Sequence, residues 1–166
     1  MKKTITFLIL LFFNFGFCQS PDDKLKNSLE ELSKDYLTKM YIDKDYEAGS
    51  KMWDDGMLLE MQDFYRKSGQ GNFSDAVLES RVKADIEKYY KKLTKFKIEK
   101  ILDVQIETGE EFCTAYVSFE YLETIKNKSK TNKTMLIFIT KDYGKTWTMQ
   151  DWKIKDIADK VNRKLY

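Results

Sequence analysis

Eight residues near the end of the chain, Thr140-Lys141-Asp142-Tyr143-Gly144-Lys145-Thr146-Trp147, have the composition of a tight loop between two β-strands. Residues 135–139 before the loop are an unbroken apolar run, and residues 146–149 alternate polar and apolar side chains. This pattern is typical of strand, loop and strand. Asp142 can hydrogen-bond the backbone of its own turn, and Gly144 can adopt a positive φ without a Cβ clash. We therefore predict a β-hairpin here.

The same octapeptide resembles the Asp-box of sialidases and other secreted β-rich proteins, which has the pattern Ser/Thr-x-Asp-x-Gly-x-Thr-Trp. Every fixed position of that pattern is matched, and the match occurs once in the chain. In the families that contain it, the Asp-box is a structural hairpin away from the catalytic centre. The resemblance thus implies a stable turn in a secreted protein and no sialidase activity, because the chain has no repeat on the scale of a propeller.

Two further segments upstream of the hairpin alternate with the period of β-strands. The first begins at Phe96 and has Lys100 as its single exception, and the second follows a turn at Gly109. Together with the hairpin, these segments predict a four-stranded antiparallel sheet with one polar face. The residues expected to point inward are Phe96, Ile98, Leu102, Val104 and Ile106 on the first strand, and Cys113, Ala115, Val117, Phe119 and Tyr121 on the second.

Three segments before the sheet have apolar residues at helical spacing. The first runs from Leu25 to Met40, the second follows a break at residues 43–45 and has its apolar stripe from Trp53 to Tyr65, and the third runs from Leu78 to Leu93. Glycine costs about 1 kcal/mol relative to alanine inside a helix. Because Gly49 and Gly56 lie in the second region, that region is also compatible with two short helices. The end of the chain, from Ile154, is expected to form a short helix or a frayed tail.

The predicted fold class is α+β, with three N-terminal helices packed on one face of a four-stranded antiparallel, curved sheet. This element order, with the long first helix and the Lys-Asp-Tyr-Glu-Ala segment at residues 44–48, resembles the NTF2-like, or cystatin-like, cone fold. Many small exported bacterial proteins have that fold. Residues 57–65 depart from the family pattern, since they have helical spacing where a short strand pair is usual. A plain helix-on-sheet fold is the alternative.

Residues 1–18 have the pattern of a secretory signal peptide. Two lysines precede an apolar run over residues 5–13, and small residues stand three and one places before the cleavage expected after Cys18. We predict that residues 19–166 form one exported domain, periplasmic or extracellular. A lipoprotein anchored through Cys18 is the alternative, which the bulky Phe17 disfavours. The apolar run is too short to span the roughly 30 Å of a bilayer's hydrocarbon.

The composition argues against several classes of function. The formal charge of +2 comes from the two lysines of the signal peptide, so the mature chain is neutral and gives no electrostatic case for a nucleic-acid or anionic-membrane partner. The chain has 0 histidines, and therefore no ordinary general base near neutral pH, no Ser-His or Cys-His nucleophile and no imidazole ligand for zinc. We predict no metal and no cofactor. The basic cluster Lys126, Lys128, Lys130 and Lys133 is expected to lie in a solvated connection at residues 126–133.

Two carboxylates are candidate catalytic residues. Glu123 and Asp151 continue the inward parity of their strands, so both are expected to point beneath the helices near strand ends. The NTF2-like resemblance implies that a carboxylate and a tyrosine can transfer a proton inside such a cavity. The alternative is that both acids are solvated at wet strand ends. A raised pKa of either carboxylate would favour catalysis.

Four aromatic residues, Trp53, Tyr90, Phe119 and Tyr121, are expected to border a partly open apolar cavity between the helices and the sheet. A filled core is the alternative interpretation. The predicted function is an exported, non-catalytic binding module for a small apolar molecule or an envelope protein. The alternative is a cavity enzyme of isomerase or dehydratase type that uses a carboxylate and a tyrosine. The sequence does not indicate the oligomeric state.

Overall fold

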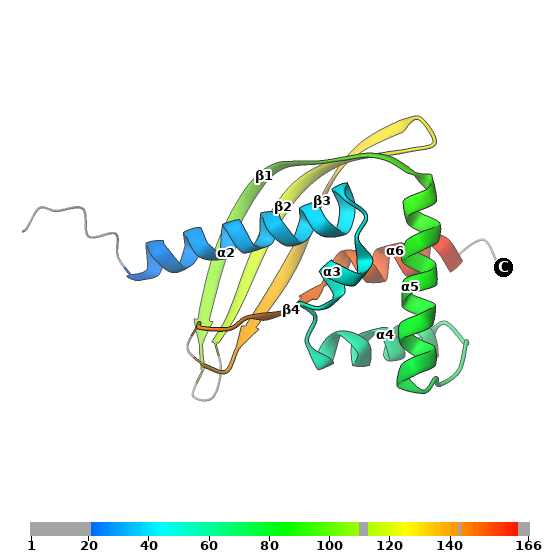
Figure 1. The fold of residues 1–166 in the computed structure, drawn as a ribbon, viewed down its shortest axis with the longest axis horizontal. Helices are drawn as coiled ribbons and strands as arrows, with labels where there is room; N and C mark the ends of the chain where they lie inside the picture. Colours follow the sequence, from blue (N-terminus) through cyan, green and yellow to red (C-terminus); the bar gives the residue numbers. More distant parts are fainter. Residues whose placement is uncertain (1–20, 110–112, 143, 163–166) are drawn as a thin grey trace, which may run out of the picture.

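A computed structural model describes residues 21–109, 113–142 and 144–162. Its fold is α+β, and its sheet has four strands that are antiparallel neighbours in sequence order, which confirms the predicted class and meander (Figure 1). The strands are β1 (Leu93–Thr108), β2 (Cys113–Ile125), β3 (Lys128–Thr140) and β4 (Thr148–Asp151). The helices are α2 (Pro21–Leu37), which continues as the π-helical segment η2 (Thr38–Ile42), then α3 (Tyr46–Ser50), α4 (Asp55–Lys67), α5 (Asp75–Lys92) and α6 (Trp152–Asn162).

The second predicted helical region is divided into α3 and α4. Between them, Trp53 makes an isolated parallel bridge with Met149 of β4, which brings this segment to the edge of the sheet. A Cβ at Gly49 would collide with the sulfur of Met40, so a small residue is needed where α3 packs on η2. Within the described residues, four α-helices precede the sheet instead of the three expected, and α6 follows it.

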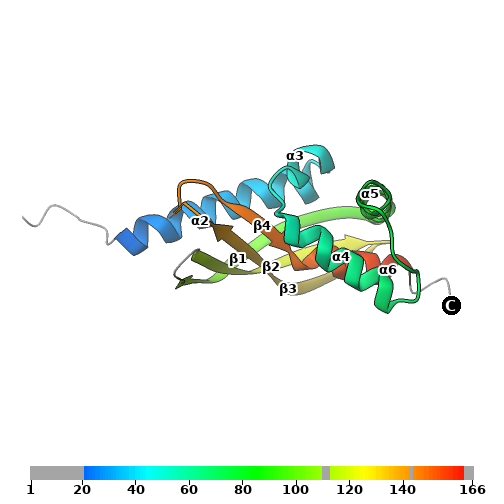
Figure 2. The same cartoon turned by 90° about the horizontal axis from the view of Figure 1, so that it is seen from below.

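The long helix α2 lies across one face of the sheet, and the view from below shows α2 and α3 on the same side of it (Figures 1 and 2). Leu29 and Tyr36 of α2 are fully buried there, as are Val117 and Phe119 of β2. At the far end of the domain, α5 and α6 pack together, and α6 also contacts β3. One contiguous core therefore joins helices from both ends of the chain to the inner face of the sheet.

Strand β1 contains irregularities that the simple alternation missed. The register with β2 shifts at three places, between Leu93 and Lys95, between Ile98 and Lys100 and between Ile101 and Asp103, and each shift inserts one residue into β1. Ile101 pairs with Phe119 and packs against the core, whereas Leu102 is 38% exposed. The prediction that Leu102 points inward is therefore wrong. After the shift between Ile101 and Asp103, the even-numbered residues of β1 face the core again. For this reason Phe96 and Ile98 before the last two shifts, and Val104 and Ile106 after them, were predicted correctly.

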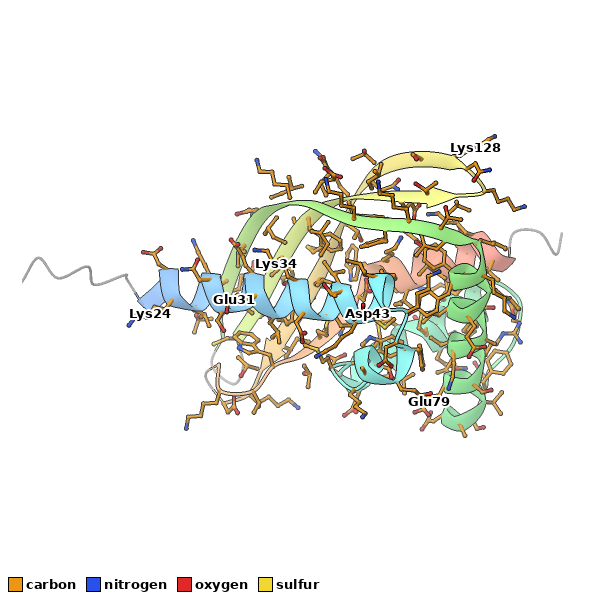
Figure 3. The ribbon with its side chains drawn as sticks, turned by 45° about the horizontal axis from the view of Figure 1, so that its top comes forward. Lys24, Glu31, Lys34, Asp43, Glu79 and Lys128 are labelled. Carbon is orange, nitrogen blue, oxygen red and sulfur yellow. The ribbon has the colours of Figure 1, made fainter. Side chains whose placement is uncertain are left out.

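The turn between β2 and β3 is shorter than the sequence suggested. Lys126 and Asn127 have positive φ values of 50° and 63°, and β3 begins at Lys128. Two successive positive φ values are typical of a two-residue hairpin turn that matches the twist of its strands. Most of the region predicted as a connection is therefore a strand, whose tip at Lys128 extends beyond the helices (Figure 3).

None of the described helices has the length and apolar character needed to cross a membrane.

Candidate functional site

Both predicted carboxylates point into the protein, as the strand alternation indicated. Glu123 is 4% exposed on β2, and Asp151 is 0% exposed at the end of β4. The alternative that these acids are solvated is wrong, because the helices extend over both strand ends. Each carboxylate instead lies in a network of hydrogen bonds with buried side chains.

Glu123 forms a buried ion pair with Lys153, a residue that was not among the candidates from the sequence. Lys153 is in the first turn of α6 and is 0% exposed. Its Nζ donates hydrogen bonds to Glu123 Oε2 at 2.9 Å and to the Tyr121 hydroxyl at 3.0 Å. The Glu123 carboxylate accepts three further hydrogen bonds, from the side chains of Tyr89 (2.7 Å), Asn132 (3.2 Å) and Lys160 (3.2 Å).

Four aromatic rings surround the Lys153 ammonium, and we call this set the aromatic cage. A cation is attracted to the negative face of an aromatic ring within about 6 Å of its centroid. The distances from Nζ to the ring centroids are 4.3 Å for Tyr121, 4.9 Å for Tyr89, 5.4 Å for Tyr41 and 5.7 Å for Phe96. The cage and Glu123 together offset the desolvation of a buried charge.

Asp151 is fixed by two tyrosines of the first helical region. Its Oδ2 accepts hydrogen bonds from the Tyr36 hydroxyl at 2.9 Å and from the Tyr41 hydroxyl, and its Oδ1 accepts one from the Lys153 backbone N–H at 2.8 Å. The Tyr36 hydroxyl in turn accepts a hydrogen bond from the Trp53 indole N–H at 3.1 Å. A continuous chain of hydrogen bonds therefore runs from Trp53 to the buried carboxylate.

The environment shifts the pKa values of the two acids in opposite directions. Burial raises the pKa of Asp151, although hydrogen bonds from Tyr41 and Tyr36 oppose that shift. Burial also acts to raise the pKa of Glu123, but the Lys153 ammonium and the hydrogen bonds from Tyr89 and Lys153 outweigh it and lower that pKa to about 2. Burial lowers the pKa of Lys153, and the charge of Glu123 counteracts this.

This arrangement has the chemistry of a proton-transfer site but gives a substrate no access. Asp151 is beside two hydroxyls and has the raised pKa that the catalytic interpretation requires. However, Asp151, Glu123 and Lys153 have exposed fractions of 0%, 4% and 0%, so no reacting atom can approach them in this conformation. Among the described residues, no group of three or more acids or cysteines could hold a metal ion.

A pocket with a volume of about 610 Å³ lies on the helical side of the molecule, and we call it the helical pocket. The rings of Tyr46 and Trp53 meet in it almost at right angles, with centroids 5.6 Å apart. Its walls come from α3, the segment before α4, α4 itself and α5. The lining residues are Tyr46, Glu47, Ser50, Lys51, Trp53, Asp54, Asp55, Leu58, Ala76, Glu79, Ser80 and Lys83.

Trp53 is held rigidly at this pocket. The Met149 N–H donates to the Met52 carbonyl at 2.8 Å, and the Asp54 N–H donates to the Met149 carbonyl at 3.0 Å, so both neighbours of Trp53 are bonded to β4. The hydrogen bond from its indole to Tyr36 fixes the orientation of the ring. Trp53 therefore connects the surface pocket with the buried Asp151 network.

The other three predicted ligand-binding residues lie in the core and not on a shared cavity wall with Trp53. Tyr90, Phe119 and Tyr121 are 8%, 0% and 2% exposed. Tyr121 belongs to the aromatic cage, and the Tyr90 hydroxyl contacts the Met40 sulfur at 3.7 Å. The sequence predicted correctly that these aromatic faces turn inward, but it gave no means to distinguish a filled core from an open one.

The hairpin that begins at Thr140 has the turn chemistry expected from its sequence. Asp142 Oδ1 accepts hydrogen bonds from the backbone N–H groups of Lys145 (3.1 Å) and Thr146 (2.9 Å), and its Oδ2 accepts one from the Thr146 hydroxyl (2.6 Å). These hydrogen bonds lower the pKa of Asp142, and the two from Thr146 have the largest effect. Gly144 has a φ of +86°. The loop is therefore stabilised by its own side chains.

Taken together, the fold and the helical pocket define a small α+β domain with a preformed aromatic pocket and a closed polar core. Comparisons with family models, with curated proteins and with solved structures found no match. The function is therefore inferred from the geometry of the chain itself.

Proposed function

We propose that this chain is a non-catalytic binding module and that its ligand site is the helical pocket. The observation that carries the proposal is the position of Trp53, which lines the pocket. Hydrogen bonds to Met149 hold its two backbone neighbours, and a hydrogen bond to the Tyr36 hydroxyl holds its indole N–H. A rigid aromatic surface binds without a large ordering cost. The pocket volume of about 610 Å³ is within the usual range for small-molecule sites.

The ligand in this proposal is a small molecule with an apolar body. Tyr46, Trp53 and Leu58 provide apolar contact area, and Ser50 and Ser80 provide hydroxyls that can orient a polar group. The apolar cavity expected from the sequence is thus replaced by an amphiphilic pocket on the helical side. An envelope protein is the other partner considered, and it would have to insert a side chain of the same kind into this pocket.

The proposal also includes export and an NTF2-like fold. The element order, a long helix followed by an antiparallel meander, supports the resemblance. The signal peptide at residues 1–18 and the lipoprotein alternative through Cys18 lie outside the described residues and stay predictions. N-terminal sequencing of the exported protein tests them, with Gln19 as the first residue expected and an acylated Cys18 as the contrary result.

Benzyl alcohol, a neutral probe with one aromatic ring, tests the pocket directly. Each of the three tryptophans contributes one indole N–H signal to an NMR spectrum, and Trp152 on α6, 49% exposed and outside the helical pocket, is the control. We expect a saturable shift of the Trp53 signal with a dissociation constant of the order of 10 mM. Tyr46→Ser should weaken that binding. An unmoved Trp53 signal, or an equal response at Trp152, contradicts the proposal.

A cavity enzyme of isomerase or dehydratase type is the second candidate, and the raised pKa of Asp151 is the observation that favours it. This function needs an opening through which a substrate reaches Asp151 Oδ2 beside the Tyr41 hydroxyl. A Tyr41 hydroxyl proton that exchanges rapidly with water would support such an opening. A slowly exchanging proton, visible by NMR at neutral pH, would rule it out.

A further inference from the structure

We infer that the helical pocket selects cationic ligands, namely small molecules that carry an ammonium group on an aromatic or aliphatic body. The inference rests on the proposed function, because it names the ligand class of the same pocket. It follows from three features of the lining: an excess of carboxylates, aromatic rings whose faces attract cations, and a lysine of the chain that already occupies part of the site.

The lining carries more negative than positive charge. Four carboxylates and two ammonium groups are present, so the pocket has an excess of two negative charges in a mature chain that is neutral overall. Glu79 extends from the part of α5 that neighbours α3 (Figure 3). The carboxylates are Glu47, Asp54, Asp55 and Glu79, and the ammonium groups are those of Lys51 and Lys83. Such a pocket attracts cations and repels anions.

The tyrosine in the pocket responds to this negative potential. Burial raises the pKa of Tyr46 to about 12, and the charges of Glu79 and Glu47 act in the same direction. Both carboxylates are therefore near enough to the phenol to disfavour a second anion. A cation in the same place would be favoured by the same two charges.

The ammonium group of Lys83 already occupies the kind of position that a cationic ligand would take in this pocket. Its Nζ lies 5.6 Å from the centroid of the Tyr46 ring and forms an ion pair with Glu47. An ammonium group is thus already accommodated between an aromatic ring and a carboxylate of this pocket. The Lys83 side chain is 42% exposed, so an incoming cation can displace it without disturbing the core.

Three probes that share a benzyl or phenyl ring separate charge from shape: benzylammonium, benzyl alcohol and benzoate. We expect benzylammonium to bind about fivefold more tightly than benzyl alcohol, and benzoate to bind most weakly. The difference should shrink as salt rises toward 0.5 M, where the Debye length is about 4 Å. Equal affinity for the cation and the alcohol would overturn this inference and leave the proposed function intact. No binding of any of the three would overturn both.

Three substitutions test the residues behind the selectivity. Glu79→Gln should weaken benzylammonium binding about twofold and leave benzyl alcohol unchanged. Glu31→Gln removes the same charge from α2, outside the pocket, and should change neither probe. Lys83→Gln removes the internal competitor and should tighten benzylammonium binding. A Lys83→Gln variant that binds the cation less tightly would contradict the inference.

Discussion

At the scale of single residues, Lys153 shows how a charge can be stabilised without solvent. Its ammonium has a carboxylate at 2.9 Å, a hydroxyl at 3.0 Å and four aromatic rings around it. Removing one partner of a buried ion pair leaves the other uncompensated, which costs more than the pair contributes. The Glu123–Lys153 pair should therefore behave as a unit in mutagenesis.

A double-mutant cycle tests this unit. We expect Lys153→Met and Glu123→Gln each to lower the free energy of unfolding by about 3–5 kcal/mol, because each leaves a buried polar partner unpaired. The double variant should lose less than the sum, with a coupling energy of about 1–3 kcal/mol. Urea denaturation measures all four corners of the cycle. Additive losses would mean that the two side chains do not interact.

The same pair predicts a pH dependence. The folded pKa of Glu123 is about 2, below its ordinary value of 4.5, so its contribution to stability is complete above pH 4.5 and is lost as the pH falls toward 2. That contribution is roughly 1–3 kcal/mol, because Lys160, which also pairs with Glu123, is 47% exposed and solvent screens its charge. The raised pKa of Asp151 acts in the opposite direction, because a folded state that holds a proton more tightly gains stability on acidification.

Unfolding measured between pH 5 and pH 2.5 therefore separates the two carboxylates. Wild-type protein should lose more stability over this range than Glu123→Gln/Lys153→Met, in which Asp151 is still present. If the free energy of unfolding depended on pH identically in the two proteins, Glu123 would not be held in its ionised form by Lys153.

The sequence contained a signal for Lys153, although the role of the residue could not be deduced from it. Lys153 precedes Ile157 by four positions and Val161 by eight, so on a helix it falls in one row with these two apolar residues. The aromatic cage was not predictable in the same way. Its rings come from η2, α5, β1 and β2, and only the tertiary packing brings them together.

At the scale of secondary-structure elements, the two insertions in the middle of β1, at Glu99 and Leu102, show where simple alternation fails. An inserted residue changes which face the following side chains occupy, and two insertions three residues apart cancel. Lys100 was one sign of the irregularity, because it interrupted the expected apolar face. Bulges also disrupt an edge strand that would otherwise present a regular ladder to other chains.

The register predicts opposite outcomes for two neighbouring residues. Ile101 packs against the core opposite Phe119, so Ile101→Lys should cost about 2 kcal/mol or more. Leu102 is 38% exposed, so Leu102→Lys should cost less than about 1 kcal/mol. Chemical denaturation of the two variants provides the comparison. A larger loss of stability for Leu102→Lys than for Ile101→Lys would fit an uninterrupted alternation along β1 and contradict the bulges.

The hairpin after β3 was predicted well, because its structure depends on neighbours in sequence. Gly144 has a φ of +86°, where a β-branched residue is strained, so Gly144→Val should cost about 1–3 kcal/mol. Gly144→Asn is the control, since asparagine tolerates left-handed backbone, and it should cost less. Asp142→Ala should also destabilise the fold through its lost turn bonds. Thermal denaturation midpoints that are unchanged for both Gly144→Val and Asp142→Ala would contradict this view of the loop.

At the scale of the whole molecule, the aromatic residues considered as ligand-binding candidates divide into two groups with different roles. Phe119, Tyr121 and Tyr90 fill the core, whereas Trp53 and Tyr46 line the surface pocket. Composition and periodicity predicted the fold class, the four strands and the inward direction of Glu123 and Asp151. They could not locate the pocket, because it forms where α3, α4 and α5 meet, and the sequence does not specify how those helices are arranged.

Intermolecular NOEs between benzylammonium and the protein test the position of the ligand site most directly. The ring protons of the probe should give NOEs to the ring protons of Trp53 and Tyr46, whose centroids lie 5.6 Å apart in the helical pocket. Tyr121 and Phe119, which are buried in the core, should give none. NOEs to Trp152 alone, or to the core rings in place of Trp53 and Tyr46, would contradict the assignment of the pocket as the binding site.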